Sequence, residues 1–460
     1  MGKKLFVTFY GGVGTVTGAN FLLEEENTVS GAVKILVDCG LFQGEHFAED
    51  MNRLPFPYNP KDVNFLLITH AHADHIGRIP RLVKEGFSGR IYSTPETKRL
   101  AEVMFDDMVV LLDKDARENG VLPLYDRNDV SKAVSLWEGI PYHTDFALTD
   151  RFSLFLKDAG HILGSSMYEI TYNGKKIVFT GDLGNTPTPL LRDTESVAGA
   201  TYLIMESVYG DRNHEKIDER RMKLKKVIDG VVRKKGTLVI PAFSMERTQV
   251  LLHEINHLVE SGVLTALPVF LDSPLAIRVT GIYREMAHDF NDQVRAEIKA
   301  GDDIFSFPRL KFTLHTNDSR AIQSTPNPKI IIAGSGMSEG GRVVTHEKKY
   351  INDPNSTILL VGYQSQGTLG RELSNGAKKV TIDGEHYPVR ATIGSIQGYS
   401  SHKDSDHLIA FVEDAREGLK KVFTVMGEPK ASLFLVQRLR DYVGVDALYP
   451  EKGKRYELLF

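Results

Sequence analysis

The chain has 460 residues, which exceeds the usual size of a single hydrophobic core, so we expect at least two lobes. Its 56 Lys and Arg against 60 Asp and Glu give a net charge of −4, which excludes a protein coated with basic residues. Any site for a polyanion must therefore be a local basic groove. The single cysteine, Cys39, excludes an intramolecular disulfide and favours a reducing compartment.

The N-terminal stretch superficially resembles a secretion signal, with a basic start and an apolar run. Gly11, Gly12 and Gly14 interrupt that run, and its alternation is typical of a strand that enters a turn. No segment approaches the ~18 consecutive apolar residues that a membrane span needs. We therefore expect a cytoplasmic protein that does not cross a membrane.

Residues 1–200 are predicted to form short strands separated by turns. The segments that read as strands are KKLFVTFYG, NFLLEEE, KILVDCG, NFLLITH, RIYSTP, FSLFLKDAGH, MYEITYN and KKIVFTGD. Many of them end on a polar or glycine-rich cluster. Loops at strand ends are where layered α/β proteins build their sites, so these clusters are the candidates.

From about Thr201 the pattern changes to apolar β-branched runs that alternate with helical segments. TYLIMES, TLVIPAF, PVFLDS, KIIIAGSGM and STILLVGY have the composition of buried parallel strands with crossover helices. Short strands return after about Ala377, with helices around 407–417 and 431–442. The chain therefore divides into 1–200, an inserted α/β domain over 201–376, and 377–460, which resumes the first lobe.

The strongest chemical signal is HAHADH, which holds His70, His72, Asp74 and His75 directly after a predicted strand. Imidazole and carboxylate groups suit zinc, and two metals about 3.5–4 Å apart form a clamp for displacement at phosphorus. Further ligands must come from elsewhere, and His161 and Asp182 both follow strands. Asp38 is a candidate to orient a ligand histidine.

The ordered series VDCG, HAHADH, GHILGS and GDLG resembles the metallo-β-lactamase superfamily. The later segments MESVYGDR, PAFSMERTQ, LDSPLA, GSGMSEGGR, GYQSQGTLGREL and SSHKD resemble its β-CASP branch. They are most similar to prokaryotic relatives of the endonuclease subunit of the cleavage and polyadenylation specificity factor. The resemblance covers nearly the whole chain and implies an α/β fold, an αββα sandwich with an inserted β-CASP domain.

The resemblance also implies the site residues and the activity, which is zinc-dependent hydrolysis of single-stranded RNA by a metal-bound hydroxide. His70, His72 and His161 would hold the first of two Zn²⁺ ions. Asp74 and His75 would hold the second, with Asp182 bridging. Glu206 and His402 match a family acid–histidine pair suited to general-acid work, so the catalytic set is Asp74, Glu206 and His402. A homodimer is common in this family, although no residue here demonstrates one.

One departure from the family pattern concerns the second metal. Members that cut RNA usually carry VHGE, whereas this chain has VMGE, so Met426 stands where a ligand histidine is expected. A thioether is a weak zinc ligand, and methionine is far more often packing than coordination. We therefore expect a weakened second site. Members that process DNA typically have an apolar residue there, so a DNA nuclease stays open.

Two other motifs are candidates for a functional site. HEINH matches the HExxH pattern of zinc proteases, but the apolar stripe of that helix predicts that His253 and His257 face water, away from any cleft. GSGMSEGGR follows a strand, and its small residues would let backbone N–H groups approach a phosphate. Ser335, Gly336 and Arg342 are therefore candidate contacts to a substrate phosphate, with a tight βα turn as the alternative.

Three rival functions stay open. A small-molecule hydrolase of the same fold is disfavoured by the inserted lobe. A catalytically weak RNA-binding subunit and a DNA nuclease are the other two. An extended single strand suits a site between two lobes better than a duplex does.

Overall fold

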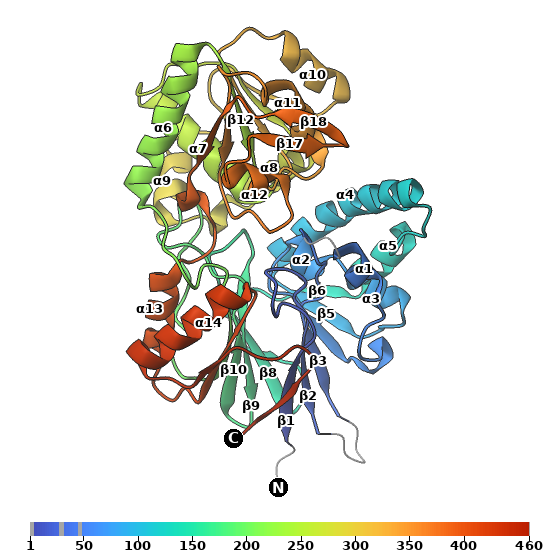
Figure 1. Ribbon diagram of the computed structural model, residues 1–460. Coiled ribbons are helices and arrows are strands. Elements are labelled where there is room, and N and C mark those ends of the chain that lie inside the picture. Colours follow the sequence, from blue (N-terminus) through green and yellow to red (C-terminus); the bar gives the residue numbers. More distant parts are fainter. Residues whose placement is uncertain (1–3, 27–31, 45–47, 460) are drawn as a thin grey trace. The chain divides into compact units, whose positions relative to one another are not determined.

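The computed structural model describes residues 4–26, 32–44 and 48–459, which fall into two compact units (Figure 1). The first unit comprises Met1–Asn213 together with His402–Phe460, and the second is His214–Ser401. The second unit is thus inserted into the first along the chain. None of the described helices is both long enough and apolar enough to span a bilayer.

The first unit contains two seven-stranded mixed sheets. One has the order β22 (Arg455–Leu458), β1 (Leu5–Phe9), β2 (Phe21–Glu25), β3 (Lys34–Val37), β4 (Phe65–Leu67), β5 (Arg90–Ser93) and β6 (Trp137–Gly139). The other has the order β21 (Ala447–Leu448), β20 (Lys421–Val425), β11 (Ala200–Glu206), β10 (Lys175–Phe179), β9 (Ser166–Tyr172), β8 (Phe152–Asp158) and β7 (Phe146–Ala147). Both combine antiparallel hairpins with parallel pairs. Parallel pairs include β4, β10 and β11, which precede or carry His70, Asp182 and Glu206, whereas His161 follows β8, whose neighbours are antiparallel.

The two sheets pack face to face. One buried cluster joins Val7 and Ile35 of the first sheet to Ile170 and Phe179 of the second, and all four side chains are at most 1% exposed. The helices of this unit are α1 (Ala48–Arg53), α2 (Ala73–Ile76), α3 (Ile79–Lys84), α4 (Pro95–Asn119), α5 (Arg127–Ser135), α13 (Ser405–Ala415) and α14 (Pro429–Arg438). A second cluster packs α13 and α14 on the outer face of the second sheet. The predicted αββα sandwich is confirmed.

The second unit is built on a six-stranded parallel sheet with the order β14 (Leu310–Phe312), β13 (Val269–Asp272), β15 (Lys329–Ala333), β12 (Thr237–Pro241), β16 (Thr357–Leu360) and β19 (Thr392–Ser395). A hairpin of β17 (Lys379–Ile382) and β18 (Glu385–Pro388) is separate from it. Its helices are α6 (Ile217–Lys234), α7 (Arg247–Glu260), α8 (Pro274–Glu285), α9 (Asp292–Lys299), α10 (Thr316–Ala321), α11 (Gly341–Tyr350) and α12 (Leu369–Ser374). The inserted α/β domain is therefore present as predicted.

The compact units change over at different residues from the predicted domain boundaries at 200/201 and 376/377. TYLIMES forms β11, which pairs in parallel with β10 and β20 and so belongs to the sandwich. At the other end, β19 pairs in parallel with β16 of the second unit. Strand composition alone could not assign these two strands to a sheet, because buried parallel strands look alike in either unit. The exact domain division stays a proposal.

Two local predictions were wrong. Residues 95–119 form α4, a helix of 25 residues, inside a region predicted as strands and turns. His253 was predicted to face water, but it is only 6% exposed and its Nε2 lies 3.0 Å from Glu297 Oε2. Helix α7 is buried on several sides, because its polar Glu254 and Asn256 are also enclosed. His257 is exposed as predicted, so the HEINH pair does not converge on a metal site.

Glu347 on α11 is a buried carboxyl group of the second unit. Its side chain is fully buried, accepts a hydrogen bond from Ser338 Oγ, and leaves Oε2 without a partner among the described residues. Burial raises the pKa of Glu347 to about 7. The unfolded value is about 4.3, so the folded state holds the extra proton between these values and loses stability as pH rises through them.

We therefore expect Glu347→Gln to be more stable than the parent protein at pH 8 by on the order of 3 kcal/mol. The two should converge near pH 4. Urea unfolding followed by circular dichroism at several pH values measures this difference. Glu372→Gln, an exposed carboxylate on α12 of the same unit, is the matched control and should leave the pH profile unchanged. Parallel profiles for Glu347→Gln and the parent protein would contradict the assignment.

Candidate metal centre

Three loops of the first unit bring the candidate ligands together. His70 and His72 follow β4, and Asp74 and His75 lie on the short helix α2 that comes next. His161 follows β8, and Asp182 follows β10. The loops pack backbone against backbone. A Cβ added to Gly40 would lie 1.5 Å from Asp74 O, and one added to Gly184 would lie 1.9 Å from Gly160 O. Glycine is required at both positions, because any side chain would push the ligand loops apart.

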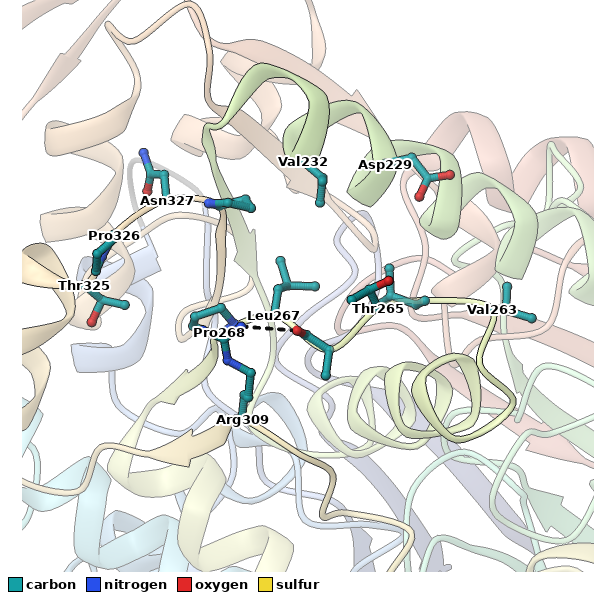
Figure 2. A pocket seen from close by; sticks show the side chains of 13 residues that line it. Asp229, Val232, Val263, Thr265, Leu267, Pro268, Arg309, Thr325, Pro326 and Asn327 are labelled. Atoms are coloured by element: carbon teal, nitrogen blue, oxygen red, sulfur yellow. Dashed lines mark hydrogen bonds between the residues drawn. The ribbon is translucent and has the colours of Figure 1, made fainter.

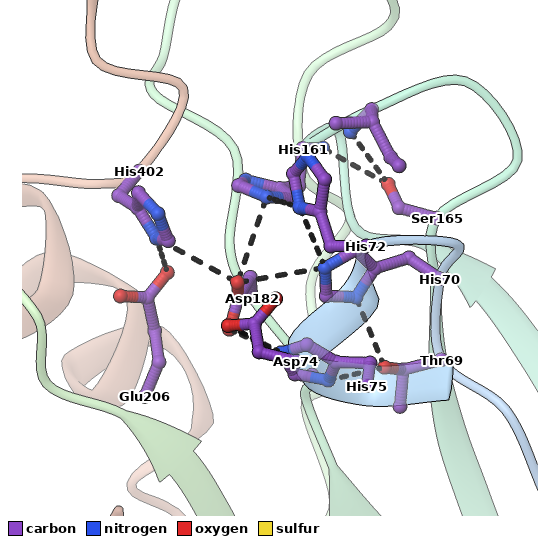
Figure 3. Close-up of polar contacts among 12 residues, drawn as sticks. Thr69, His70, His72, Asp74, His75, His161, Ser165, Asp182, Glu206 and His402 are labelled. Carbon is purple, nitrogen blue, oxygen red and sulfur yellow. Dashed lines mark hydrogen bonds and ion pairs between the residues drawn. The ribbon is translucent and has the colours of Figure 1, made fainter. Parts of the chain in front are cut away.

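Three imidazole rings and one carboxylate converge at the centre of the site (Figure 3). His72 Nδ1 lies 3.0 Å from His70 Nε2 and 3.2 Å from His161 Nε2. Asp182 Oδ2 lies 3.5 Å from His70 Nε2 and 3.6 Å from His161 Nε2. Each residue thus directs one donor atom toward a common point, and this is the set predicted for the first metal together with Asp182.

A second group shares Asp182. His75 Nε2 lies 3.5 Å from Asp182 Oδ1 and 3.8 Å from Asp74 Oδ2. Both His75 Nε2 and Asp182 Oδ1 are buried and form no hydrogen bond with any described residue. Buried polar atoms are normally satisfied, so these two atoms indicate a missing partner. A cation between them would satisfy both, and the donor set therefore fits a metal.

The opposite edge of His75 is held by Asp38. His75 Nδ1 lies 2.7 Å from Asp38 Oδ2, and Asp38 also accepts hydrogen bonds from the Thr69 backbone N–H and hydroxyl. A carboxylate on one ring nitrogen fixes the ring and leaves the other nitrogen for a ligand. This is the orienting position predicted for Asp38. Thr69 was missed, although it directly precedes His70.

The charges in the cluster are strongly interdependent. Burial and the neighbouring His75 hold the pKa of His70 well below its usual range. Burial alone would raise the pKa of Asp182, but His75 and His70 outweigh it and hold that pKa well below the usual value. Burial raises the pKa of Asp74 to about 6. A neutral His70 and an ionised Asp182 are the protonation states that a metal ligand needs.

Glu206 and His402 form a pair on the other side of Asp182 (Figure 3). Glu206 ends β11, is fully buried, and its Oε1 lies 3.0 Å from His402 Nδ1 and accepts from the Leu183 backbone N–H. His402 Nδ1 is 4.0 Å from Asp182 Oδ2. Burial opposes the charged form of His402, but Glu206 and Asp182 raise its pKa above the usual value. The structure thus brings the predicted pair together beside the metal cluster.

Lys403 is a further residue at this edge that the sequence analysis did not single out. Its backbone N–H donates to Leu183 O at 2.9 Å, and its Nζ donates to Thr186 Oγ1 at 2.7 Å. Burial lowers its pKa to about 8. Both contacts tie the Asp182 loop to the His402 segment. The sequence signal for Lys403 is its position in the SSHKD motif, directly after His402.

Met426 lies in the hydrophobic core between the sheets. It is 1% exposed and belongs to the cluster that includes Phe21 and Phe179. Its Sδ packs so closely on Gly12 that an added Cβ there would lie 2.5 Å from it. The side chain therefore packs as an apolar residue.

The glycine-rich segment 334–341 follows β15 in the second unit. The Arg342 guanidinium is engaged by Asp272 Oδ1 at 2.7 Å, Thr313 O at 2.6 Å and Leu314 O at 3.0 Å. Ser335 Oγ donates to Glu339 O at 2.6 Å, and Gly336 packs on the ring of Phe243. These contacts stabilise the turn, and the phosphate role of Ser335, Gly336 and Arg342 stays a prediction.

A pocket of about 390 Å³ in the second unit contains none of the predicted site residues (Figure 2). It lies at the amino-terminal ends of the strands, between α6 and the segments 263–268 and 325–328. Its lining includes Asp229, Val232, Leu267, Arg309 and Asn327. The amino-terminal edge is the opposite one from the edge where parallel α/β sheets usually bind ligands.

A two-sheet sandwich with His and Asp side chains gathered on its strand-end loops defines a metal-dependent hydrolase of the metallo-β-lactamase class. Comparison with known proteins agrees. The sequence matches the metallo-beta-lactamase superfamily domain over residues 28–205, the Beta-Casp domain over 248–373, and the Zn-dependent metallo-hydrolase RNA specificity domain over 386–450. The chain belongs to the β-CASP family of the metallo-β-lactamase superfamily.

Several curated proteins are similar over most of the chain. Ribonuclease TTHA0252 of Thermus thermophilus is 33% identical over 93% of this chain and 94% of its own length. Transcription termination factor FttA of Methanosarcina mazei is 29% identical and that of Pyrococcus abyssi is 31% identical. The chain spans only 68% and 60% of these two longer relatives. A solved protein of unknown function from Enterococcus faecalis shares the fold, with a TM-score of 0.52 and 14% identity over 99% of this chain.

Proposed function

We propose that this chain is a zinc-dependent ribonuclease that hydrolyses phosphodiester bonds of single-stranded RNA. The observation that carries the proposal is the convergence of His70, His72, His161 and Asp182, with the Glu206–His402 pair directly beside it. The match to an RNA specificity domain and the similarity to a ribonuclease along 94% of its length support RNA as the substrate.

The cluster would hold two Zn²⁺ ions, the first through His70, His72 and His161 and the second through Asp74 and His75. Asp182 would contribute to both. Ligand atoms of one tetrahedral zinc lie about 3.3 Å apart, given Zn–N distances of ~2.0–2.1 Å. The nitrogen and oxygen atoms of the first group are 3.0–3.6 Å apart. Bound zinc supplies Lewis acidity and lowers the pKa of a coordinated water to about 7.

The residues around the proposed metal sites orient a ligand and transfer a proton. Asp38 holds the His75 ring and thereby aims Nε2 at Asp182. Glu206 accepts from His402 Nδ1, so the proton available for transfer is the one on His402 Nε2. When the P–O bond breaks, that proton goes to the leaving oxygen, and the negative charge of Glu206 favours the protonated imidazole before the transfer.

The second metal should be held more weakly than the first. Met426 packs in the core and offers only a thioether, so Asp74, His75 and Asp182 are the protein ligands that remain. We further propose that the enzyme acts in the cytoplasm, because its one cysteine is a buried free thiol. A homodimer stays a prediction from the family resemblance.

The test is cleavage of an end-labelled single-stranded RNA and of a single-stranded DNA of the same sequence, with zinc or manganese added. We expect RNA to be cut faster than DNA, by protein that holds close to two metals and loses one of them first on dialysis. Equal cutting of both would favour the DNA nuclease, as Met426 suggests. RNA that is bound but never cut under any metal supplement would favour a binding subunit.

A further inference from the structure

Helix α6 of the second unit carries seven basic residues against three acidic ones. Its buried face consists of Leu224, Ile228 and Val231, each at most 1% exposed, and it packs toward β12. Four basic residues lie on the solvent face, and all are exposed: Lys223, Lys226, Arg233 and Lys234. In a chain of net charge −4, this local excess needs a reason.

The four residues form one continuous stripe. Their spacing of three, seven and one residues, with Gly230 at the turn between, keeps them on one side of the helix. Eleven steps separate the first and last residues of the stripe, so it is about 16 Å long, at ~1.5 Å of rise per residue. We name it the α6 stripe and define it as Lys223, Lys226, Gly230, Arg233 and Lys234.

Local structural roles account for only part of this charge. Lys223 pairs with Glu215 at 3.2 Å, and Lys234 Nζ donates to Thr392 Oγ1 at 3.1 Å. Lys226 and Arg233 form no ion pair within the described part of the chain. The helix dipole favours cations in the last turn, which explains Arg233 and Lys234 but not Lys223 and Lys226.

Gly230 is the second observation. Glycine is a poor helix former, and it usually needs a packing reason inside a helix. Here an added Cβ would meet only Arg233 Nη2, at 3.9 Å, and its φ lies in the ordinary helical region. Neither packing nor backbone conformation requires glycine. The missing side chain instead exposes bare backbone between four cations, which allows an anionic ligand to approach closely.

We propose that the α6 stripe, which belongs to the second unit, is a contact surface for the phosphate backbone of single-stranded RNA in addition to the metal centre of the first unit. This proposal rests on the proposed function, because it takes RNA as the substrate. Lysine and arginine side chains that meet phosphates supply affinity without reading sequence. The stripe would therefore help to hold long RNAs of any sequence.

The test is equilibrium binding of a fluorescent single-stranded RNA of thirty nucleotides at several salt concentrations, with EDTA present to prevent cutting. We expect Lys226→Gln/Arg233→Gln to raise Kd roughly tenfold and to lower the slope of log K against log salt by about 1.4, since each phosphate contact on a single strand contributes ~0.7. Lys114→Gln/Lys132→Gln, which removes two exposed lysines of the first unit, is the matched control and should change neither value.

Gly230→Ala separates binding from folding. Alanine favours the helix, so Tm should rise by about 2–4 °C, while the added methyl group should raise Kd for RNA. Hydrolysis of bis(p-nitrophenyl) phosphate, a small diester, should be the same in all variants and the parent protein.

If Lys226→Gln/Arg233→Gln matches the control variant in RNA affinity and salt slope, the proposal is wrong. An acidic protein surface would then be the partner that fits the stripe. The outcome is distinguishable from failure of the proposed function. A parent protein that binds RNA but cuts no diester would contradict the nuclease, whereas the binding data would still decide the stripe.

Discussion

Replacing Asp182 by Ala should remove metal from the protein and lower RNA cleavage by about 10³-fold or more. Asp182 lies within 3.5–3.6 Å of His70, His75 and His161, and no other carboxylate of the described residues does so. A bound metal contributes several kcal/mol to transition-state stabilisation, and each 1.36 kcal/mol corresponds to a tenfold change in rate. Loss of the shared carboxylate should affect both metal positions at once. Metal content per chain and cleavage of end-labelled RNA measure the two effects.

Controls separate this effect from loss of the fold. Asp182 is buried, so its replacement also removes a buried charge that lies 3.5 Å from His75 Nε2. Circular dichroism and the urea midpoint of the variant should therefore be measured alongside. Asp414→Ala removes an exposed carboxylate of the same unit and should leave metal content and cleavage unchanged. A folded Asp182→Ala protein with its full metal complement would show that the cluster is not the metal centre.

The convergence of the side chains in the metal cluster could be predicted because four of them are close neighbours in the sequence. His70, His72, Asp74 and His75 occupy six consecutive residues, and His161 and Asp182 follow strands that enter the same sheet. Parallel strands deliver their carboxyl ends to one edge, so residues after such strands meet there. The resemblance to a known family then divided these residues between a first and a second metal site. In the structure, the side chains of these residues lie close together.

The sheet to which each strand belongs and the burial of His253 depend on tertiary contacts. β11 and β12 have the same buried, apolar composition, yet β11 pairs with β10 and β20 while β12 pairs with β15 and β16. Pairing partners cannot be read from composition. The burial of His253 likewise comes from Glu297 on another helix, whereas a stripe on its own helix was the only guide available.

Helix α4 could have been predicted. Thr94 caps its start by accepting from Thr97 N–H, Pro95 occupies the first turn, and Gly120 ends it with φ 67°. Leu100, Met104 and Met108 recur at helical spacing and are buried. These are ordinary start and stop signals. The predicted strands on both sides favoured strands and turns for this segment, despite its 3.6-residue apolar period.

His402→Ala should lower RNA cleavage by about 10²–10⁴-fold while leaving the metal content almost unchanged. His402 Nδ1 lies 3.0 Å from Glu206 Oε1 and 4.0 Å from Asp182 Oδ2. This geometry supports the proposal that His402 supplies a proton to the leaving oxygen. The alkoxide that leaves RNA needs that proton. Nitrophenolate does not, so hydrolysis of bis(p-nitrophenyl) phosphate should change little.

The contrast between the two substrates is the decisive readout, because a merely structural defect would lower both rates together. Glu206→Gln keeps a hydrogen-bonding group beside His402 but removes the charge, so it should show the same contrast to a smaller degree. His407→Ala, which removes a partly exposed histidine paired with Asp404, is the matched control and should be neutral. If His402→Ala instead strips the metal, or slows both substrates equally, His402 is a ligand or a scaffold residue and the proton must come from elsewhere.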